Sequence, residues 1–211
     1  NDVFAVTGMN EGTVNGISFS SFENLDGRDG NDSIDFQTSG NLSGAVEGGN
    51  GSDSLSISRP GLLTVNITGA GVDTANATGN GVAGNEAAAI AGGFNNINSV
   101  TATGSDVLNG ADADATWDLD TTNTYTVGGQ SASFAGFSNL NGGTQADTFN
   151  VNSSVSFDVN GRDGDDSVNI ASSVTLSGDV FGGNGMDTLS IVTGGTLSGA
   201  FDGEAGSDTL T

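Results

Sequence analysis

The sequence predicts an all-β protein, a parallel β-solenoid (β-helix or β-roll) with rungs of about 21 residues. Three observations predict this fold: a recurring glycine-rich turn phrase that ends in aspartate, alternation of apolar and polar residues between its copies, and a composition that disfavours helix. Of the 211 residues, 36 are Gly. Five of the 26 acidic residues are Glu, so the other 21 are Asp, which favours turns over helices.

The turn phrase sets the repeat length. Its copies are GRDGNDSI at 27–34, GGNGSDSL at 48–55, GGTQADTF at 142–149, GRDGDDSV at 161–168, GGNGMDTL at 182–189 and GEAGSDTL at 203–210. A looser copy, TATGSDVL, lies at 101–108, and NDVF at 1–4 resembles the end of another. In the last four copies the aspartates are 19, 21 and 21 residues apart. This spacing lies in the range of solenoid repeats.

Between the turn phrases the sequence has the two-residue period of β-strands. In DTLSIVTGGTLSGAFD at 187–202, Leu189 and Ile191 alternate with Thr188 and Ser190, and a second alternating stretch follows the TGG turn. Short strands of this kind cannot bury an apolar face alone. Stacking equivalent strands of successive rungs in parallel would close a core.

We expect one continuous solenoid over 1–211. Regular rungs are predicted near 22–58 and 137–211, with irregular, insert-bearing rungs over 61–136. That middle region holds strand-like pieces (LLTVNI, ATWDLD and TYTVGG) for which the repeat predicts no position. Neither end of the chain shows a distinct polar cap, so we expect end-to-end stacking on copies of the chain or on flanking repeats.

Charge and composition exclude several partners. The net charge is −23, and three arginines with no lysine offer no basic patch for nucleic acid. No apolar run reaches the roughly 18 residues that a membrane-spanning helix needs, so no membrane insertion is expected. Cys and His are absent, which excludes zinc and haem ligation and leaves a hard, oxygen-binding cation such as Ca²⁺.

Two copies of the phrase, GGNGSDSLS at 48–56 and GGNGMDTLS at 182–190, resemble the nonapeptide of the RTX (repeats-in-toxin) family. With leaders such as FENLD at 22–26 and FSNLN at 137–141, the chain resembles repeat regions of giant bacterial surface adhesins and filamentous-haemagglutinin-like exoproteins. The resemblance implies an extracellular or bacterial cell-surface location. It also implies a structural or adhesive module of a large secreted protein that forms a rod or filament.

The resemblance further implies calcium ions held between stacked turns by backbone carbonyls and by the sixth-position aspartate. The metal ligands would be Asp32, Asp53, Asp147, Asp166, Asp187 and Asp208. Ca²⁺ takes six to eight oxygens, and glycine lets a turn direct its carbonyls inward. Unlike that family, this chain carries the phrase on one edge of each rung at most. The alternative without calcium is that these side chains accept neighbouring backbone N–H groups.

Two pairs of side chains have open alternatives. Arg28 and Arg162 replace the second glycine of the phrase, and they would either bridge carboxylates of adjacent rungs or form solvated surface ion pairs. Trp117 and Tyr125 would either form a platform for sugars or pack beneath a loop.

Of the function classes, a structural or adhesive rod fits best, and a module that binds glycans or another ligand is the alternative. Parallel β-helices include polysaccharide-cleaving enzymes, which use a basic group or Tyr beside acidic ligands. Outside the turn phrases this chain offers only Arg59 and Tyr125 as such groups. We therefore predict no enzyme and no catalytic residues.

Overall fold

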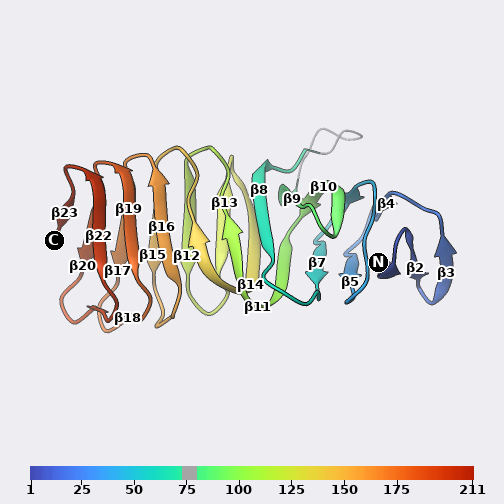
Figure 1. Ribbon diagram of the computed structural model, residues 1–211, viewed down its shortest axis with the longest axis horizontal. Coiled ribbons are helices and arrows are strands. Elements are labelled where there is room, and N and C mark those ends of the chain that lie inside the picture. The colour runs from blue at the N-terminus through green and yellow to red at the C-terminus, as the bar shows by residue number, and fades with distance from the viewer. Residues whose placement is uncertain (73–79) are drawn as a thin grey trace.

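The computed structural model describes residues 1–72 and 80–211, which form an elongated stack of β-strands (Figure 1). These residues contain no helix, and 59% of them lie in strands of a mostly parallel sheet. Figure 1 shows the strands crossing the long axis, with the first strands at one end and the last at the other. The all-β prediction is confirmed. In the part of the chain that the structure describes, no helix has the length and hydrophobicity needed to cross a membrane.

The strands form three groups along the chain. The N-terminal strands are β1 (Val3–Gly8), β2 (Glu11–Val14), β3 (Ile17–Ser20), β4 (Leu25–Asp26), β5 (Ser33–Phe36), β6 (Val46–Glu47) and β7 (Ser54–Ile57). The middle strands are β8 (Thr64–Ala70), β9 (Val82–Glu86), β10 (Ile90–Ile97), β11 (Ser99–Asn109), β12 (Ala115–Leu119), β13 (Thr124–Val127) and β14 (Gln130–Asn141). The C-terminal strands are β15 (Asp147–Val151), β16 (Asp158–Asp163), β17 (Ser167–Ile170), β18 (Thr175–Leu176), β19 (Val180–Gly185), β20 (Thr188–Ile191), β21 (Thr196–Leu197), β22 (Phe201–Gly206) and β23 (Thr209–Leu210).

Strands that follow the turn phrase stack on one another in what we call the first row. In the N-terminal part, β1, β5, β7 and the start of β11 pair in parallel, and in the C-terminal part β12, β15, β17, β20 and β23 do the same. Ser33 pairs with Ser54, and Ser167 with Thr188, each a step of 21 residues. Neighbouring copies of the repeat therefore lie directly over one another.

A second row forms from the strands that lead into the turn phrase. It consists of β4, β6 and β10, followed by β8, the end of β11, the end of β14, β16, β19 and β22. Strands β18 and β21 pair in parallel and form a separate short sheet. Along the chain, each of them follows a strand of the first row and precedes a strand of the second row. Each regular rung thus contributes one strand to the first row and one to the second.

Each row contains one antiparallel strand, in the middle of the molecule, and the strands on either side of it run in the same direction. The first row passes from β14 to β12 through the antiparallel strand β13, and the second row passes from β10 to β8 through the antiparallel strand β9. Both antiparallel strands lie within 61–136, where the sequence predicts irregular rungs. They account for the long intervals between turn phrases there. Residues 73–79 of this region lie outside the described residues.

The N-terminal end of the first row carries a hairpin that the repeat pattern does not predict. β2 pairs antiparallel with β1, and β3 pairs antiparallel with β2. Asn15 and Gly16 make the turn, both with positive φ as a tight hairpin requires. The expectation that neither end is capped is therefore wrong at this end, because an antiparallel hairpin covers the edge of the parallel stack.

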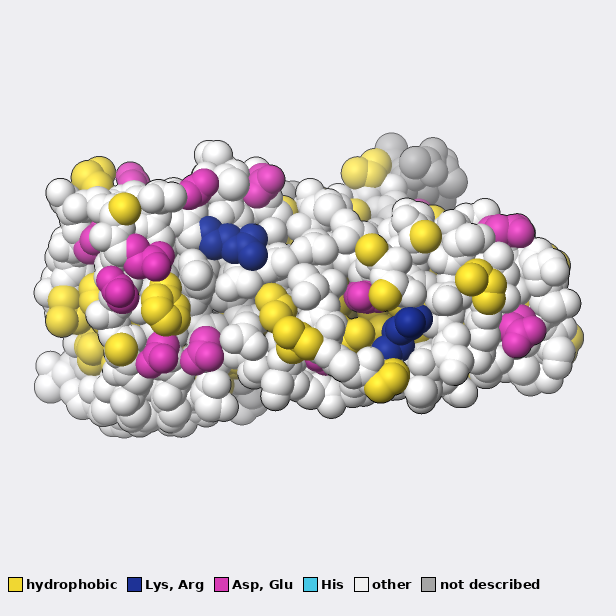
Figure 2. Space-filling view, in the orientation of Figure 1, with side chains coloured by type: hydrophobic (Ala, Val, Ile, Leu, Met, Phe, Trp, Pro, Cys, Tyr) yellow, Lys and Arg dark blue, Asp and Glu magenta, His cyan; other side chains and the backbone are white. Residues whose placement is uncertain are grey.

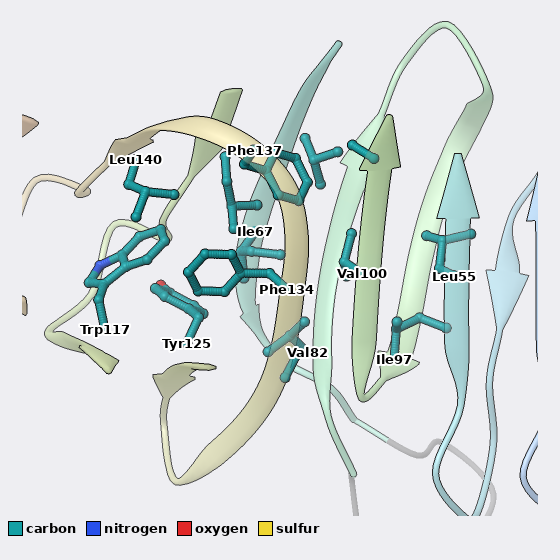
Figure 3. Packing of buried hydrophobic residues seen from close by; sticks show 14 of the residues in the cluster. Leu55, Ile67, Val82, Ile97, Val100, Trp117, Tyr125, Phe134, Phe137 and Leu140 are labelled. Atoms are coloured by element: carbon teal, nitrogen blue, oxygen red, sulfur yellow. The ribbon is translucent and has the colours of Figure 1, made fainter. Parts of the chain in front are cut away.

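The core consists of the inward-facing apolar positions of both rows, in one buried cluster. Leu189 is 1% exposed and Val168 5%, as the alternation predicts. Trp117 and Tyr125 are fully buried beside Phe134 (Figure 3). The Trp117 ring stacks on Phe149 with centroids 5.3 Å apart, and the Tyr125 hydroxyl accepts a hydrogen bond from the Ala111 amide at 2.8 Å. Trp117 and Tyr125 are therefore packed inside the protein, and they cannot form a platform for sugars because neither ring reaches the surface.

Candidate functional site

The aspartates of the turn phrase form a buried column along the first row. Each one directly precedes, or begins, a strand of that row, so parallel stacking places the side chains above one another. Five of them are at most 3% exposed, and Asp208, on the last rung, is half-buried. The buried members are Asp32, Asp53, Asp147, Asp166 and Asp187. All six predicted site residues thus fall into this column, in two runs of consecutive rungs.

One oxygen of five of the six carboxylates accepts a backbone hydrogen bond from the preceding rung; the exception is Asp147, whose Oδ2 accepts from the Gly143 amide of its own turn. The Asp147 amide donates to Asp166 Oδ1 at 2.7 Å, the Asp166 amide to Asp187 Oδ1 at 2.8 Å, and the Asp187 amide to Asp208 Oδ1 at 3.0 Å. The Asp32 amide donates to Asp53 Oδ1 at 2.8 Å in the N-terminal run. The repeat therefore joins its rungs through side chains as well as through strand pairing.

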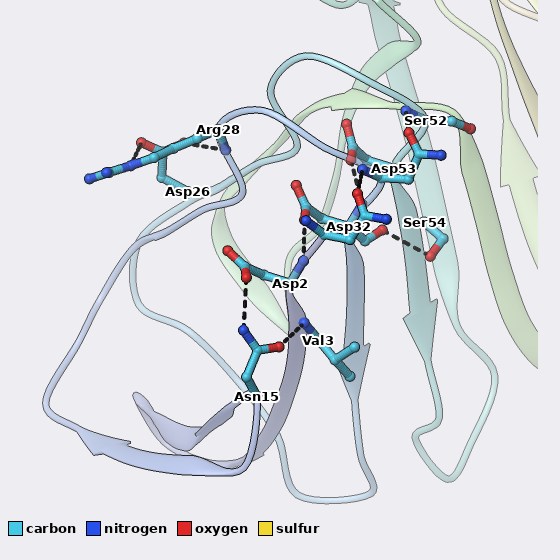
Figure 4. Close-up of polar contacts among 11 residues, drawn as sticks. Asp2, Val3, Asn15, Asp26, Arg28, Asp32, Ser52, Asp53 and Ser54 are labelled. Carbon is cyan, nitrogen blue, oxygen red and sulfur yellow. Dashed lines mark hydrogen bonds and ion pairs between the residues drawn. The ribbon is translucent and has the colours of Figure 1, made fainter.

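The N-terminal run begins and ends on asparagines that the sequence analysis missed, and Figure 4 shows the first of them, Asn15. At one end, Asn15 of the hairpin turn donates to Asp2 Oδ1 at 2.8 Å, and the Asp2 amide donates to Asp32 Oδ1. At the other end, the Asp53 amide donates to Asn98 Oδ1 at 2.9 Å. A signal for Asn98 exists in the sequence. Asn98 is followed by serine and an alternating strand, as Asp32 and Asp53 are.

The second oxygen of the carboxylate faces the first glycine of its own turn. In Asp32, Asp53, Asp166 and Asp187, Oδ2 is buried and has no hydrogen-bond partner among the described residues. A Cβ added to the first glycine of any copy would lie within 3 Å of this oxygen. In every copy except the last, which has no following rung, the same Cβ would also lie within 3 Å of a backbone carbonyl oxygen of the next rung. These glycines are Gly27, Gly48, Gly142, Gly161, Gly182 and Gly203. Glycine at this position is therefore what allows the carboxylate to lie inside the turn.

Burial raises the pKa of four carboxyls of the column, those of Asp53, Asp147, Asp166 and Asp187. The pKa of Asp166 rises to about 7, mainly through desolvation, against the lowering effect of the hydrogen bond from the Asp147 amide. The charges of Asp147, Asp187 and Asp165 raise it further. The pKa of Asp147 rises to about 6 for the same main reason, opposed first by the Gly143 amide, which donates to Oδ2 at 2.7 Å. Desolvation also raises the pKa of Asp53.

These shifts predict that the chain is less stable at alkaline pH. The ordinary pKa of an aspartate in the unfolded chain is 3.8, so between about pH 4 and 7 the folded state binds more protons at Asp166 and Asp147. Stability is then highest near the unfolded pKa and falls as pH rises through the folded pKa values. We expect the free energy of unfolding, measured by urea titration in a chelator, to be about 2–4 kcal/mol lower at pH 8 than at pH 5. A free energy that is equal or higher at pH 8 would contradict the assignment.

Arg28 and Arg162 stand at the second position of the turn phrase, where most copies have left-handed backbone. Gly49 and Gly183 have φ of 95° and 110°, and Arg28, Arg162 and Glu204 adopt φ of 67°, 78° and 62° at the same place. Five of the six copies thus have left-handed backbone at this position, whether glycine or another residue occupies it, and Gly143 is the exception. The side chains of Arg28 and Arg162 are both exposed.

Neither arginine bridges carboxylates of adjacent rungs. Arg28 Nε lies 3.8 Å from Asp26 Oδ2 in its own turn, with both side chains exposed, which confirms the solvated ion pair. Arg162 Nη2 donates to Asn109 Oδ1 at 2.8 Å instead. The bridging alternative is wrong for Arg162 as well, because its hydrogen-bond partner is an amide. Figure 2 shows basic side chains at only two separate places on the visible face.

The looser copy of the phrase at 101–108 lies elsewhere. Asp106 is 3% exposed and accepts from the Leu63 amide at 2.9 Å, but it precedes the part of β11 that belongs to the second row. Its Oδ2 also accepts from the Thr103 amide at 3.1 Å. Asp106 therefore accepts backbone amides in the second row, as the aspartates of the column do in the first. Sequence spacing alone does not separate it from the column.

The residues of the column do not fit a calcium ion in this arrangement. Ca²⁺ needs six to eight oxygens at about 2.3–2.6 Å. In the column, Oδ1 of Asp166, Asp187 and Asp208 accepts from a backbone amide, and Oδ2 lies within 3 Å of the place that a Cβ on the first glycine of its own turn would occupy. Within the described residues, no three side chains of the His, Cys, Asp and Glu types are grouped as a metal site. Calcium binding stays a prediction of the resemblance.

Comparisons with known proteins supply no relative. No family model matches the chain. No curated protein and no solved structure matches it either.

Proposed function

We propose that this chain is a parallel β-solenoid that serves as a structural and adhesive rod module of a large secreted or cell-surface bacterial protein. The observation that carries the proposal is the register of the two strand rows. Neighbouring rungs superpose at steps of 21 residues, and side-chain hydrogen bonds of the buried column repeat at the same step. A protein built in this way has stiffness and length as its main physical properties.

The negative charge of the chain supports a rod that does not associate laterally with other copies. A net charge of −23 makes lateral contact between two such rods repulsive. Axial contact is different, because strand edges associate through backbone hydrogen bonds. At the C-terminal end the described strands β22 and β23 have a parallel partner on one side only. We propose that copies of the chain, or flanking repeats, contact this edge.

Light scattering with an edge variant tests the axial contact. The amides of Thr209 and Thr211 donate to β20, which leaves the Leu210 amide directed away from the stack. Leu210→Pro removes that outward donor without removing a bond to β20. We expect the parent chain to associate through its C-terminal edge as its concentration rises and the variant to stay monomeric. A parent chain that remains a monomer at all concentrations would contradict the proposed axial contact.

A glycan-binding module is the second candidate, and a polar surface cleft favours it. Asn109 accepts from Asn141 at 2.8 Å and donates to Asn66 at 2.6 Å, which makes a ladder of amides across three strands of the second row. A cleft of about 310 Å³ beside it is lined by Asn66, Asn109, Asp112 and Arg162. Binding to a panel of immobilised glycans that is lost in Arg162→Gln would favour this function over a purely structural one.

A further inference from the structure

We propose that the aspartate column is a register ladder of backbone-amide acceptors, in which an amide oxygen serves as well as a carboxylate, and that it does not hold calcium. The ladder fixes which rung lies on which, since the side chains of Asp53, Asp166, Asp187 and Asp208 each accept from the amide of the equivalent residue in the rung before. This inference concerns how the stack is held together. It does not depend on the adhesive role proposed above.

The chain itself contains the substitution that the inference requires. Asn98 takes the next place in the column after Asp53, and its Oδ1 accepts the Asp53 amide at 2.9 Å, as an aspartate does elsewhere. Asn98 Nδ2 donates to Asn80 Oδ1 at 2.9 Å. A carboxylate charge is thus not needed for the ladder bond.

The second row repeats the arrangement independently. Asn24 Oδ1 accepts the Ala45 amide at 2.8 Å, Asp158 Oδ1 the Asp179 amide at 2.9 Å, and Asp179 Oδ1 the Ala200 amide at 2.7 Å. The donor lies 21 residues after the acceptor in each case. Asparagine and aspartate therefore interchange in this position too. In the second row the bonds run from the later rung to the earlier one, opposite to the column.

The position of Oδ2 also disfavours an ion. In a calcium site both carboxylate oxygens, or one of them with several carbonyls, converge on an open centre. Here Oδ1 of Asp187 accepts from the Asp166 amide, while its Oδ2 lies within 3 Å of the place that a Cβ on Gly182 would occupy. Oδ1 of Asp187 is thus engaged by an amide, which leaves one oxygen of this carboxylate for an ion.

Thermal melting of three variants tests the ladder. Asp166→Asn keeps the Oδ1 acceptor for the Asp147 amide and removes the charge. Asp166→Ala removes the acceptor and leaves a buried amide unpaired. Asp112→Asn, at an exposed position outside the column, controls for the loss of one negative charge. Each protein is melted in EDTA and again with millimolar CaCl₂, and calcium titrations of the parent chain are followed by calorimetry.

The ladder predicts a distinct order of melting temperatures. We expect Asp166→Asn to melt at or above the parent temperature, Asp112→Asn to match the parent, and Asp166→Ala to melt about 5 °C or more below it. If Asp166→Ala does not fold, the comparison of Asp166→Asn with the parent decides. CaCl₂ should leave the melting temperatures unchanged, and calorimetry should give no binding heat. A calcium-induced rise in the parent that Asp166→Asn abolishes would overturn the inference.

Discussion

Gly161→Ala is expected to unfold the C-terminal rungs. A Cβ at position 161 would lie within 3 Å of Asp166 Oδ2 and of the Gly182 carbonyl oxygen. Both atoms are fixed, the first by burial in the column and the second by the backbone of the next rung. The methyl group must therefore push the two rungs apart, which breaks the hydrogen bonds on which the stack depends. We expect a loss of several kcal/mol, of the size of a severe core mutation, measured by urea unfolding.

Gly104→Ala is the matched control. Position 104 lies in the looser copy of the turn phrase, and a Cβ there meets no atom within 4 Å. Its backbone is not in the left-handed region, so alanine carries no conformational penalty. We expect the free energy of unfolding to change by less than about 1 kcal/mol. Equal losses in the two variants would show that the position of the carboxylate is not what requires glycine at 161.

Trp117→Ala is expected to have the second large effect. Trp117 is completely buried and contacts Tyr125, Phe134 and Phe149 with ring centroids 4.4–5.8 Å away. These rings come from β12, β13, β14 and β15, so the side chain joins the antiparallel strand β13 to the first C-terminal rung. Removing it should cost about 3–5 kcal/mol through lost burial and a cavity.

The control for this variant is an aromatic residue outside the core. Phe22 is 59% exposed, and its ring contacts Phe19 edge-on at 6.1 Å. Phe22→Ala should change the free energy of unfolding by less than about 1 kcal/mol. A small loss in Trp117→Ala would mean that the middle of the molecule is not packed around this side chain.

The regular rungs are predictable from the sequence because their signal is local and repeated. A turn phrase with glycine at the first position and aspartate at the sixth, followed by Val168 and Ile170 or Leu189 and Ile191, specifies a strand and its buried face. The same residues recur at steps of 21, so stacking follows from repetition alone.

The antiparallel strands in the middle are not predictable in the same way. Strands β9 and β13 alternate buried and partly exposed positions just as the parallel strands do, and nothing local to Val82–Glu86 or Thr124–Val127 specifies the direction of the partner. Which strand they join depends on contacts far away in the sequence. The hairpin at Asn15 and Gly16 carries a local turn signal, but its docking on β1 is again a tertiary contact.

The candidate site was predictable in its residues and not in its chemistry. Periodicity places Asp147, Asp166 and Asp187 above one another, and the structure confirms that they are stacked. The orientation of each carboxylate depends on the backbone amide of another rung and on the missing Cβ of the first glycine. Those are features of the stacked state, so a ligand set and an amide acceptor look alike in the sequence.

Engineered disulfides test the parallel register of the rungs most directly, because the chain contains no cysteine of its own. Ser167 and Thr188 are register partners on adjacent strands of the first row, whereas Thr148 is one rung further from Thr188. Adjacent strands lie about 4.8 Å apart, within the reach of a disulfide, and two rungs span about twice that distance. Under mild oxidation we expect an intramolecular disulfide, detected by peptide mass spectrometry, in Ser167→Cys/Thr188→Cys and none in Thr148→Cys/Thr188→Cys. A disulfide that forms only in the second pair would contradict the stacked-rung architecture.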